Sequence, residues 1–303
     1  MTGRRWRCSG PDGLADFEFV QVEGATPGPD EVRVEVSAAG VNPADLKHTR
    51  RATAYPVPVG YEIAGVVTDV GSAAAGLFAP GDRVVAFRVH GGYATELTFP
   101  AEKAFILPDS VDDVAAAGLL LAGTTAADML HRSGASDGDT ILVHGASGAV
   151  GATLLQLAAR RGVRVVGTAG AMRFDAVRRF GGVPVAYGPG LIDRLHGWTF
   201  DAALDLAGTD EATDASLALV PDKSRIITAA NKPAADRHGF VAVAGMDPES
   251  TAFRDAVRPE LIGLLAAGEL EVPVAQTFPL AQAREALELV ASGTAGGKVV
   301  LTV

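Results

Sequence analysis

The fold is decided by one stretch, residues 141–151, which reads ILVHGASGAVG. Its apolar, β-branched start is typical of a buried strand, and glycines at positions 145, 148 and 151 separate that strand from an Ala- and Leu-rich helical segment. A strand, a glycine-rich turn and a helix in this order are the context of a dinucleotide-binding site. The sequence therefore predicts that a phosphate-bearing cofactor binds at this turn.

Two glycines of the turn have a clear physical task. Gly148 would allow a pyrophosphate to approach the backbone N–H groups at the positive end of the helix. Gly151 would allow the helix to pack closely against the strand. Ala146 stands where the usual fingerprint has its first glycine. The cofactor-binding residues predicted from this turn are Ser147, Gly148, Ala149, Val150 and Gly151.

Strands and helices alternate through the residues that follow the turn. With the strand before the turn, the expected strands are 140–144, 164–168, 183–187, 201–206, 225–228 and 240–244, and the clearest helices are 149–161 and 171–180. Val- and Ile-rich strands separated by crossover helices give a parallel sheet covered on both faces. This part of the chain is therefore predicted to be a doubly wound α/β domain.

The residues before this domain have a different sequence pattern. Short β segments linked by Gly and Pro run to about residue 107, and helical segments follow at 111–121 and 124–132. We place the domain boundary near Gly123. Near the C-terminus we expect a helix at 259–268, another within 278–293 and a final strand at 298–303. These last residues should return to the first, β-rich module.

Composition and charge exclude several classes of protein. The 303 residues carry a formal net charge of −10, from 26 basic and 36 acidic side chains, so we expect no nucleic-acid partner. No apolar run is long enough to span a membrane, and the N-terminus lacks the apolar core of a signal peptide. The one cysteine, Cys8, cannot form an internal disulfide or a multi-thiolate zinc site. These features predict a cytoplasmic protein without membrane partners.

The choice of nucleotide depends on the end of the second strand of the sheet. An Asp or Glu roughly 20 residues after the turn would bind the ribose 2′-OH of NAD. No carboxylate is present there before Asp175, whereas Thr168 and Arg173 could bind a 2′-phosphate. NADPH is therefore the predicted cofactor. The alternative interpretation is that Arg173 is simply a solvated residue in the first turn of a helix.

Further motifs occur in a fixed order along the chain. They are AGVNPADLK at 39–47, GYEIAGVV at 60–67, GDRV at 81–84, GGYATE at 91–96, AGTTA at 122–126 and GKVVL at 297–301. With these motifs the sequence resembles the medium-chain dehydrogenase/reductase superfamily, and within it the zinc-free quinone oxidoreductases of the zeta-crystallin type. The resemblance implies a discontinuous GroES-like substrate domain of residues 1–122 and 263–303, a Rossmann dinucleotide-binding domain of residues 123–262, and a cofactor cleft between them.

The sequence departs from the zinc-dependent members of that superfamily. Asn42 stands where they have Cys, and Tyr61 stands where they have His. The lobe with four cysteines is also absent from the sequence, so neither zinc site can be built and no metal ligands are predicted. Without a Lewis acid, the favoured chemistry is hydride delivery to an electrophilic carbon, as in a quinone or an α,β-unsaturated carbonyl.

The resemblance also suggests roles for single residues. It implies catalytic roles for Asn42, Tyr61 and Thr125, substrate contacts for Lys47 and Tyr93, and cofactor contacts for Tyr187 and Ala207. Each residue has a structural alternative. Asn42 precedes a proline in a turn, Tyr61 could be a pocket-lining aromatic, and the Thr125 hydroxyl could bond back within its helix. The six histidines are dispersed in sequence and suggest no covalent catalysis, so bulk water is a candidate proton donor.

These observations predict an NADPH-dependent, zinc-independent oxidoreductase that acts on a small-molecule substrate. The alternatives are a dedicated enoyl or ketone reductase of a biosynthetic pathway and a nucleotide-sensing or nucleic-acid-binding relative without enzymatic activity. The strand expected at 240–244 would be an exposed sheet edge in a monomer. Pairing of that edge across a two-fold axis predicts a homodimer.

Overall fold

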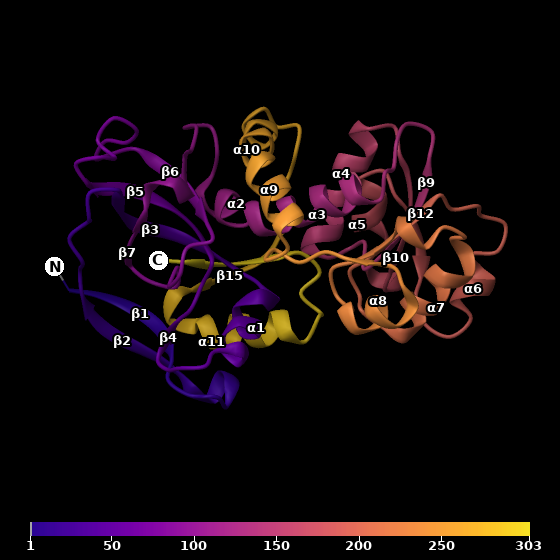
Figure 1. Ribbon diagram of the computed structural model, residues 1–303, viewed down its shortest axis with the longest axis horizontal. Coiled ribbons are helices and arrows are strands. Elements are labelled where there is room, and N and C mark those ends of the chain that lie inside the picture. Colours follow the sequence, from indigo (N-terminus) through magenta and orange to yellow (C-terminus); the bar gives the residue numbers. More distant parts are fainter. Residues whose placement is uncertain (1) are drawn as a thin grey trace. The chain divides into compact units, whose positions relative to one another are not determined.

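A computed structural model describes residues 2–303 of the chain. The chain forms two compact units (Figure 1). Unit 1 contains residues 1–121 and 262–303, and unit 2 contains residues 122–261. The boundaries expected from the sequence lie one residue further along the chain at both crossings. Helices α3 (Leu120–Arg132) and α10 (Arg258–Ala266) contain these crossings.

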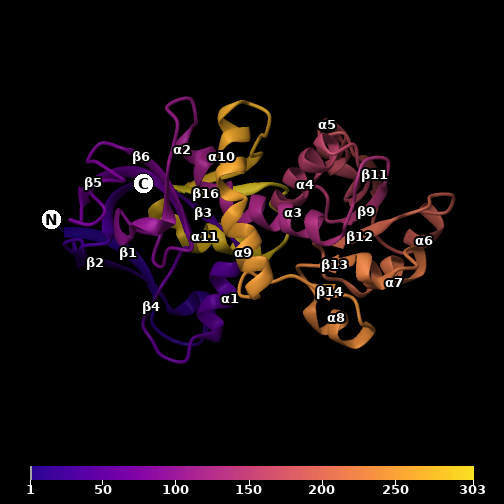
Figure 2. The same ribbon diagram turned by 45° about the horizontal axis from the view of Figure 1, so that its top comes forward.

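Unit 2 is built on a six-stranded parallel sheet. Its strands are β9 (Thr140–His144), β10 (Arg164–Ala169), β11 (Val183–Ala186), β12 (Ala202–Asp205), β13 (Ile226–Thr228) and β14 (Val241–Ala242). The order across the sheet is β11-β10-β9-β12-β13-β14, with a reversal between β9 and β12. Figure 2 labels β11, β9, β12, β13 and β14 of this sheet. This is the doubly wound order predicted from the alternation of strands and helices, and ligands bind beside such a reversal.

Helices connect the strands of unit 2. They are α4 (Ala149–Arg160), α5 (Phe174–Arg179), α6 (Leu191–Arg194), α7 (Asp210–Leu219) and α8 (Lys232–His238), and α9 (Pro248–Ala256) follows the last strand. The helix expected at 171–180 begins as a separate 3-10 turn, Ala171–Arg173. Helix α9 was not expected, although Asp247 caps its N-terminus and Pro248 occupies its first turn, which are standard signals of a helix start.

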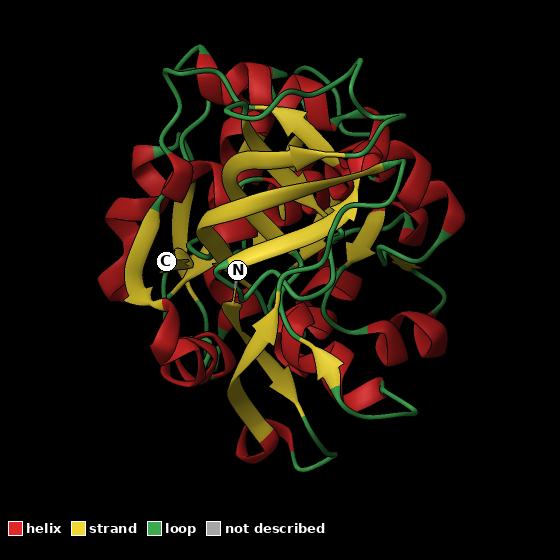
Figure 3. Ribbon diagram, turned by 90° about the vertical axis from the view of Figure 1, so that its left-hand side faces the viewer, coloured by secondary structure: helices red, strands yellow, loops and turns green. Residues whose placement is uncertain are grey.

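Unit 1 contains two sheets (Figure 3). The smaller is antiparallel and consists of β1 (Thr2–Cys8), β2 (Phe17–Glu23) and β4 (Val57–Pro58). The larger follows the order β15-β16-β3-β5-β6-β8, with β7 (Glu96–Pro100) beside β3. These strands are β15 (Val274–Pro279), β16 (Lys298–Thr302), β3 (Glu31–Val41), β5 (Glu62–Val70), β6 (Arg83–Phe87) and β8 (Ala104–Ile106). The unit's own helices are α1 (Pro43–Arg51), α2 (Asp113–Ala117) and α11 (Ala283–Ala291).

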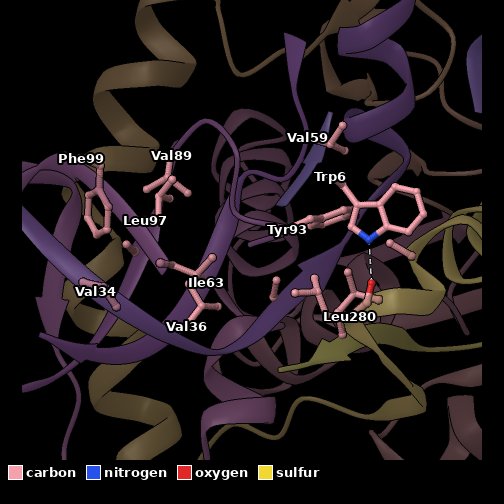
Figure 4. Close-up of a cluster of buried hydrophobic side chains, with 14 of the residues drawn as sticks. Trp6, Val34, Val36, Val59, Ile63, Val89, Tyr93, Leu97, Phe99 and Leu280 are labelled. Atoms are coloured by element: carbon pink, nitrogen blue, oxygen red, sulfur yellow. Dashed lines mark hydrogen bonds between the residues drawn. The ribbon is translucent and has the colours of Figure 1, made fainter. Parts of the chain in front are cut away.

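The C-terminal residues return to unit 1, as the sequence predicts. Strand β16 pairs antiparallel with β3, and Val299 faces Val41 in that register. The indole N–H of Trp6 donates to the carbonyl of Leu280 at 2.7 Å inside the core (Figure 4). Because these contacts join residues from both ends of the chain, unit 1 is complete only when its C-terminal part is present.

Candidate functional site

The glycine-rich turn joins β9 to α4 at the sheet reversal. A Cβ on Gly151 would lie 2.5 Å from the carbonyl oxygen of Ala146, so this position has no space for a side chain. Gly148 precedes the first helical residue, and a Cβ there would meet nothing closer than Gly145 O at 3.5 Å. Gly151 therefore serves the close packing predicted from the sequence. Gly148 leaves open space at the helix N-terminus.

The first turn of α4 can bind an anion. The N–H groups of Ala149, Val150 and Gly151 lie in this turn, where no preceding helical carbonyl can accept from them. Helix α4 has 12 residues, and its dipole favours negative charge at this end. Ser147 is only half-buried just before the helix. The turn predicted from the sequence thus has the charge and the open space that a phosphate requires.

The ends of β10 and β11 hold three residues predicted to bind the cofactor. Thr168 is buried, its Oγ1 accepts from Gly145 N at 3.3 Å, and it lies 3.4 Å from His144 Nδ1. Arg173 is exposed, and Tyr187 is 62% exposed. The Tyr187 hydroxyl lies 3.4 Å from the position of a Cβ on Gly170. Of the three side chains, Arg173 and Tyr187 face solvent, whereas the hydroxyl of Thr168 braces the glycine turn.

A buried carboxylate shapes the loop after β12. Asp205 Oδ1 accepts the N–H groups of Ala207 and Gly208, both at 2.9 Å. Its Oδ2 accepts the Thr228 hydroxyl at 2.8 Å. The N–H of Ala207 is therefore already bonded within the protein, although Ala207 itself is exposed. Any contact of Ala207 with a cofactor would need its methyl group or its carbonyl.

His144 ends β9 beside this loop. It is 1% exposed, and its burial lowers its pKa to about 4, although Asp205 and Glu211 oppose this shift. The imidazole is therefore neutral at pH 7. Among residues 2–303 its Nε2 has no hydrogen-bond partner.

Thr125 lies on α3 beside a buried ion pair. Arg254 Nε donates to Asp128 Oδ2 at 2.8 Å, and Arg254 Nη1 donates to Thr125 Oγ1 at 3.2 Å. The Arg254 and Asp128 side chains are 7% and 0% exposed. Sequence reasoning missed this pair because helix α9, which carries Arg254, was not expected. The Thr125 hydroxyl is thus held by a charged donor within unit 2.

Asn42 belongs to a buried polar network in unit 1. Lys298 Nζ donates to Asn42 Oδ1 at 2.6 Å and also to Glu62 Oε1. Asn42 Nδ2 donates to Glu62 Oε1 at 2.9 Å and to Gly40 O at 3.3 Å. Glu62 Oε2 accepts from Leu121 N at 2.8 Å, at the start of α3. Both N–H bonds of the Asn42 amide are used, so this side chain could serve a ligand only as an acceptor.

Asp45 and Tyr93 extend this buried network. Asp45 Oδ2 accepts from Asn42 N and from the Tyr93 hydroxyl, each at 2.8 Å. Burial raises the pKa of Asp45 to about 7, although these two hydrogen bonds and Lys298 act against the shift. The Tyr93 side chain is 0% exposed. This burial does not support the expected substrate contact by Tyr93, and its hydroxyl instead holds the N-terminus of α1 through Asp45.

Tyr61 and Lys47 lie closer to the surface of unit 1. Lys47 is exposed on α1, and Tyr61 is half-buried just before β5. The Tyr61 ring lies 5.1 Å from the ring of His48 and 5.7 Å from that of His90, measured between centroids. Burial, with a smaller effect of Asp45, raises the pKa of the Tyr61 phenol, which therefore remains an O–H donor. Sequence reasoning did not connect His48 and His90 with Tyr61, because the two histidines lie 42 positions apart in the chain.

The residues around Asn42 do not fit a zinc ion. No group of three or more His, Cys, Asp or Glu side chains suited to a metal occurs within the described part of the chain. The Lys298 ammonium contacts both Asn42 and Glu62, so the Glu62 carboxylate already has a cation. A divalent ion would meet a buried positive charge there.

Comparisons with known proteins match both units. Residues 28–109 match the alcohol dehydrogenase GroES-like domain, and residues 185–301 match a family model described as zinc-binding dehydrogenase. A quinone oxidoreductase of Pseudomonas aeruginosa is 30% identical, with 96% of each chain aligned. A solved quinone oxidoreductase of Escherichia coli, complexed with NADPH, has a TM-score of 0.88 at 25% identity and 100% coverage of both chains.

Other relatives are matched over only part of their length. The erythronolide synthase EryA2 of Saccharopolyspora erythraea is 31% identical over 90% of this chain, which spans 8% of that synthase. A 2-haloacrylate reductase from Burkholderia is 36% identical over 52% of this chain and 50% of the relative. Separately, none of the helices in residues 2–303 has the length and apolar character needed to cross a membrane.

Proposed function

Because the chain belongs to the quinone oxidoreductase-like family of medium-chain dehydrogenases/reductases, we propose that it is a zinc-independent, NADPH-dependent reductase. Its acceptors are quinones or α,β-unsaturated carbonyl compounds. The observation that carries the proposal is the turn between β9 and α4, where Gly148 leaves open space beside the unbonded N–H groups of a helix N-terminus.

The preference for NADPH rests on the ends of β10 and β11. Arg173 is exposed there and can donate charge-assisted hydrogen bonds to a 2′-phosphate. Tyr187 is exposed at the end of the neighbouring strand. The sequence has no carboxylate between Thr168 and Arg173 that would repel the phosphate. The bound cofactor would supply the hydride.

The chain's own side chains would orient and activate the acceptor. Tyr61 offers a neutral phenol whose O–H can donate to an acceptor carbonyl, where negative charge develops on hydride addition. Lys47 is exposed on α1, next to His48 in the sequence, and can attract an anionic group. Thr125, fixed by Arg254, is our candidate for a contact with the nicotinamide. Asn42 is a weaker candidate, since its amide has only acceptor capacity left.

A second candidate function is suggested by the partial relatives. The chain aligns over 90% of its length with a small part of erythronolide synthase, and solved relatives include the enoyl reductase of CurK, which is matched at 21% identity. A dedicated enoyl reductase that acts on one biosynthetic intermediate would use the same hydride chemistry. Such an enzyme would bind NADPH but leave simple quinones unreduced.

The domain roles and the assembly are also part of the proposal. Unit 2 would bind the dinucleotide and unit 1 the acceptor, in the cytoplasm. Strand β14 is the edge of the unit 2 sheet, although it has two residues rather than the five expected. Pairing at this edge would give a homodimer. A single sedimenting species near the chain mass of 31.0 kDa at all concentrations would contradict this assembly.

The experiment that tests the function follows NADPH consumption with matched acceptors. The panel contains ortho- and para-quinones, alkenals, alkenones and the corresponding saturated ketones, each tested with NADPH and with NADH. We expect turnover of quinones or conjugated carbonyls with NADPH, and no turnover of the saturated ketones. Activity restricted to saturated ketones would contradict the proposal, as would a failure to bind NADPH.

A further inference from the structure

Three ring side chains from separate elements meet on unit 1. His48 lies on α1, Tyr61 precedes β5 and His90 follows β6. The ring centroids of the two histidines are 5.6 Å apart, and both rings lie within 5.7 Å of the Tyr61 ring. Both histidines are exposed, whereas Tyr61 is half-buried. We call these three residues the His–Tyr cluster.

The segment that carries His90 is held in a fixed shape. Val89 N donates to Tyr61 O at 3.1 Å, and Gly91 N donates to Gly60 O at 3.1 Å. Among residues 2–303, Arg88 is the sole non-glycine residue with a positive φ, at 61°. Left-handed backbone at a residue other than glycine is costly and persists where the surroundings impose it, often at functional sites. The backbone thus fixes the base of the His90 side chain beside Tyr61.

The charges around the cluster set its protonation. Burial, Lys103 and His48 all lower the pKa of His90 below 6.5. Lys47 is the neighbour of His48 on α1, and Glu102 is exposed beside Lys103. The negative charge of the buried Asp45 helps to raise the pKa of Tyr61. The positive charges of Lys103 and His48 thus disfavour the imidazolium form of His90 and make that form a stronger acid.

We propose that the imidazole pair of His48 and His90 donates the proton that the acceptor takes up after hydride transfer. This inference rests on the proposed function. The hydride forms a new C–H bond at the β-carbon of the acceptor, and the π electrons move to give an enolate, to which Tyr61 donates a hydrogen bond. An N–H bond of the imidazolium then breaks, and its proton forms the second C–H bond at the α-carbon. Water returns a proton to the imidazole, and the bound cofactor would supply the hydride with its two electrons.

The choice of acceptor makes this step visible. Protonation of an enolate at carbon is slow and benefits from a positioned acid, whereas a reduced quinone takes its protons on oxygen, where water supplies them readily. General acid catalysis typically contributes about 10²–10⁴-fold. Loss of the two imidazoles should therefore slow alkenone reduction by about 100-fold and change quinone reduction by less than about threefold.

The test compares H48Q/H90Q with wild type and with H196Q, which removes an exposed histidine of unit 2. In wild type, kcat for an alkenone should fall as pH rises through the lowered pKa of His90, because the protonated form is required. This dependence should vanish in H48Q/H90Q and persist in H196Q. A dependence near pH 7 that remained in the double variant would belong to Asp45 and would count against the histidines. Equal loss with both acceptors, or an unchanged pH profile, would overturn the inference.

A measurement without turnover checks the coupling of the pair. The His90 ring signal in proton NMR should titrate at a higher pH in H48Q than in wild type, because the neighbouring positive charge is removed. An unchanged pKa of His90 in H48Q would contradict the electrostatic coupling between His48 and His90. If wild type reduces neither acceptor, the proposed function and this inference both fall. If wild type reduces alkenones and H48Q/H90Q does so equally well, only this inference falls.

Discussion

The glycine turn of unit 2 and the polar network of unit 1 use their motif residues in opposite ways. The turn places backbone N–H groups beside open space at Gly148. The network takes Asn42, Asp45 and Glu62 into the core, where each is at most 3% exposed. One motif therefore leaves backbone donors open to a ligand. The other joins side chains to one another inside unit 1.

The difference shows what a sequence motif can reveal. The turn is local, since its strand, glycines and helix are contiguous, and its function depends on the backbone. The network depends on side chains far apart in sequence, and the contact between Lys298 and Asn42 joins residues 256 positions apart. Burial distinguishes a binding residue from a supporting one, and burial requires the fold.

The largest effect is expected from breaking the network at Lys298. In K298M, Glu62 would remain as a buried carboxylate without its cation, which typically costs about 3–5 kcal/mol of stability. Urea unfolding followed by Trp6 fluorescence in a W198F background would report on unit 1. The double variant K298M/E62Q removes the buried charge and should recover part of the loss. Equal stability of K298M and its parent would mean that the network does not stabilise unit 1.

Asp45 gives the network a dependence on pH. The folded state raises the pKa of Asp45 from 3.8 to about 7, so between these values the folded protein binds a proton that the unfolded chain releases. Stability from this group is therefore highest below pH 4 and is lost as pH rises towards 7, by on the order of 4 kcal/mol. D45N lacks this titration. The stability of wild type relative to D45N should fall across this range, and a rise would contradict the raised pKa.

A matched pair of glycine variants separates packing from binding in the turn. In G151A the new Cβ would meet Ala146 O, and overpacking of this kind costs about 1–3 kcal/mol. In G148A the new Cβ enters open space, so thermal unfolding should change little while NADPH affinity falls. Calorimetric unfolding and fluorescence titration with NADPH measure the two effects. The reverse pattern would mean that the ligand does not approach at Gly148.

Much of unit 2 could be predicted from the sequence. Its six strands and the glycine turn follow from contiguous patterns of apolar residues and glycines. Two elements escaped that reasoning for different reasons. The edge strand β14 is limited to Val241–Ala242 because only these residues pair with β13. Helix α9 begins at an Asp cap and a proline, but the sequence analysis did not predict a helix there.

Less of the candidate site in unit 1 could be predicted. The position of Tyr61 was singled out, but the sequence could not place His48 and His90 beside it. That contact depends on the strained backbone at Arg88 and on hydrogen bonds to Gly60 and Tyr61. Tyr93 was expected to contact substrate. In the sequence, a tyrosine whose hydroxyl bonds to a buried carboxylate cannot be distinguished from one whose hydroxyl faces a ligand.

The smallest effect is expected at Arg173, where the two nucleotides are distinguished. R173A removes a charge from an exposed site, and we expect the ratio of NADPH to NADH affinity to fall by about tenfold, which corresponds to about 1.4 kcal/mol. R237A, at an exposed arginine on α8, is the control. An unchanged ratio in R173A would show that the 2′-phosphate is bound elsewhere.

The proposed reaction transfers a hydride from NADPH to the carbon of an activated double bond. The most direct measurement uses NADPH carrying deuterium at C4, prepared separately on each face, with an alkenone as acceptor. We expect one of the two labelled forms to give a saturated ketone with one deuterium at its β-carbon. Product without deuterium from either form, or NADPH consumption without any saturated ketone, would contradict it.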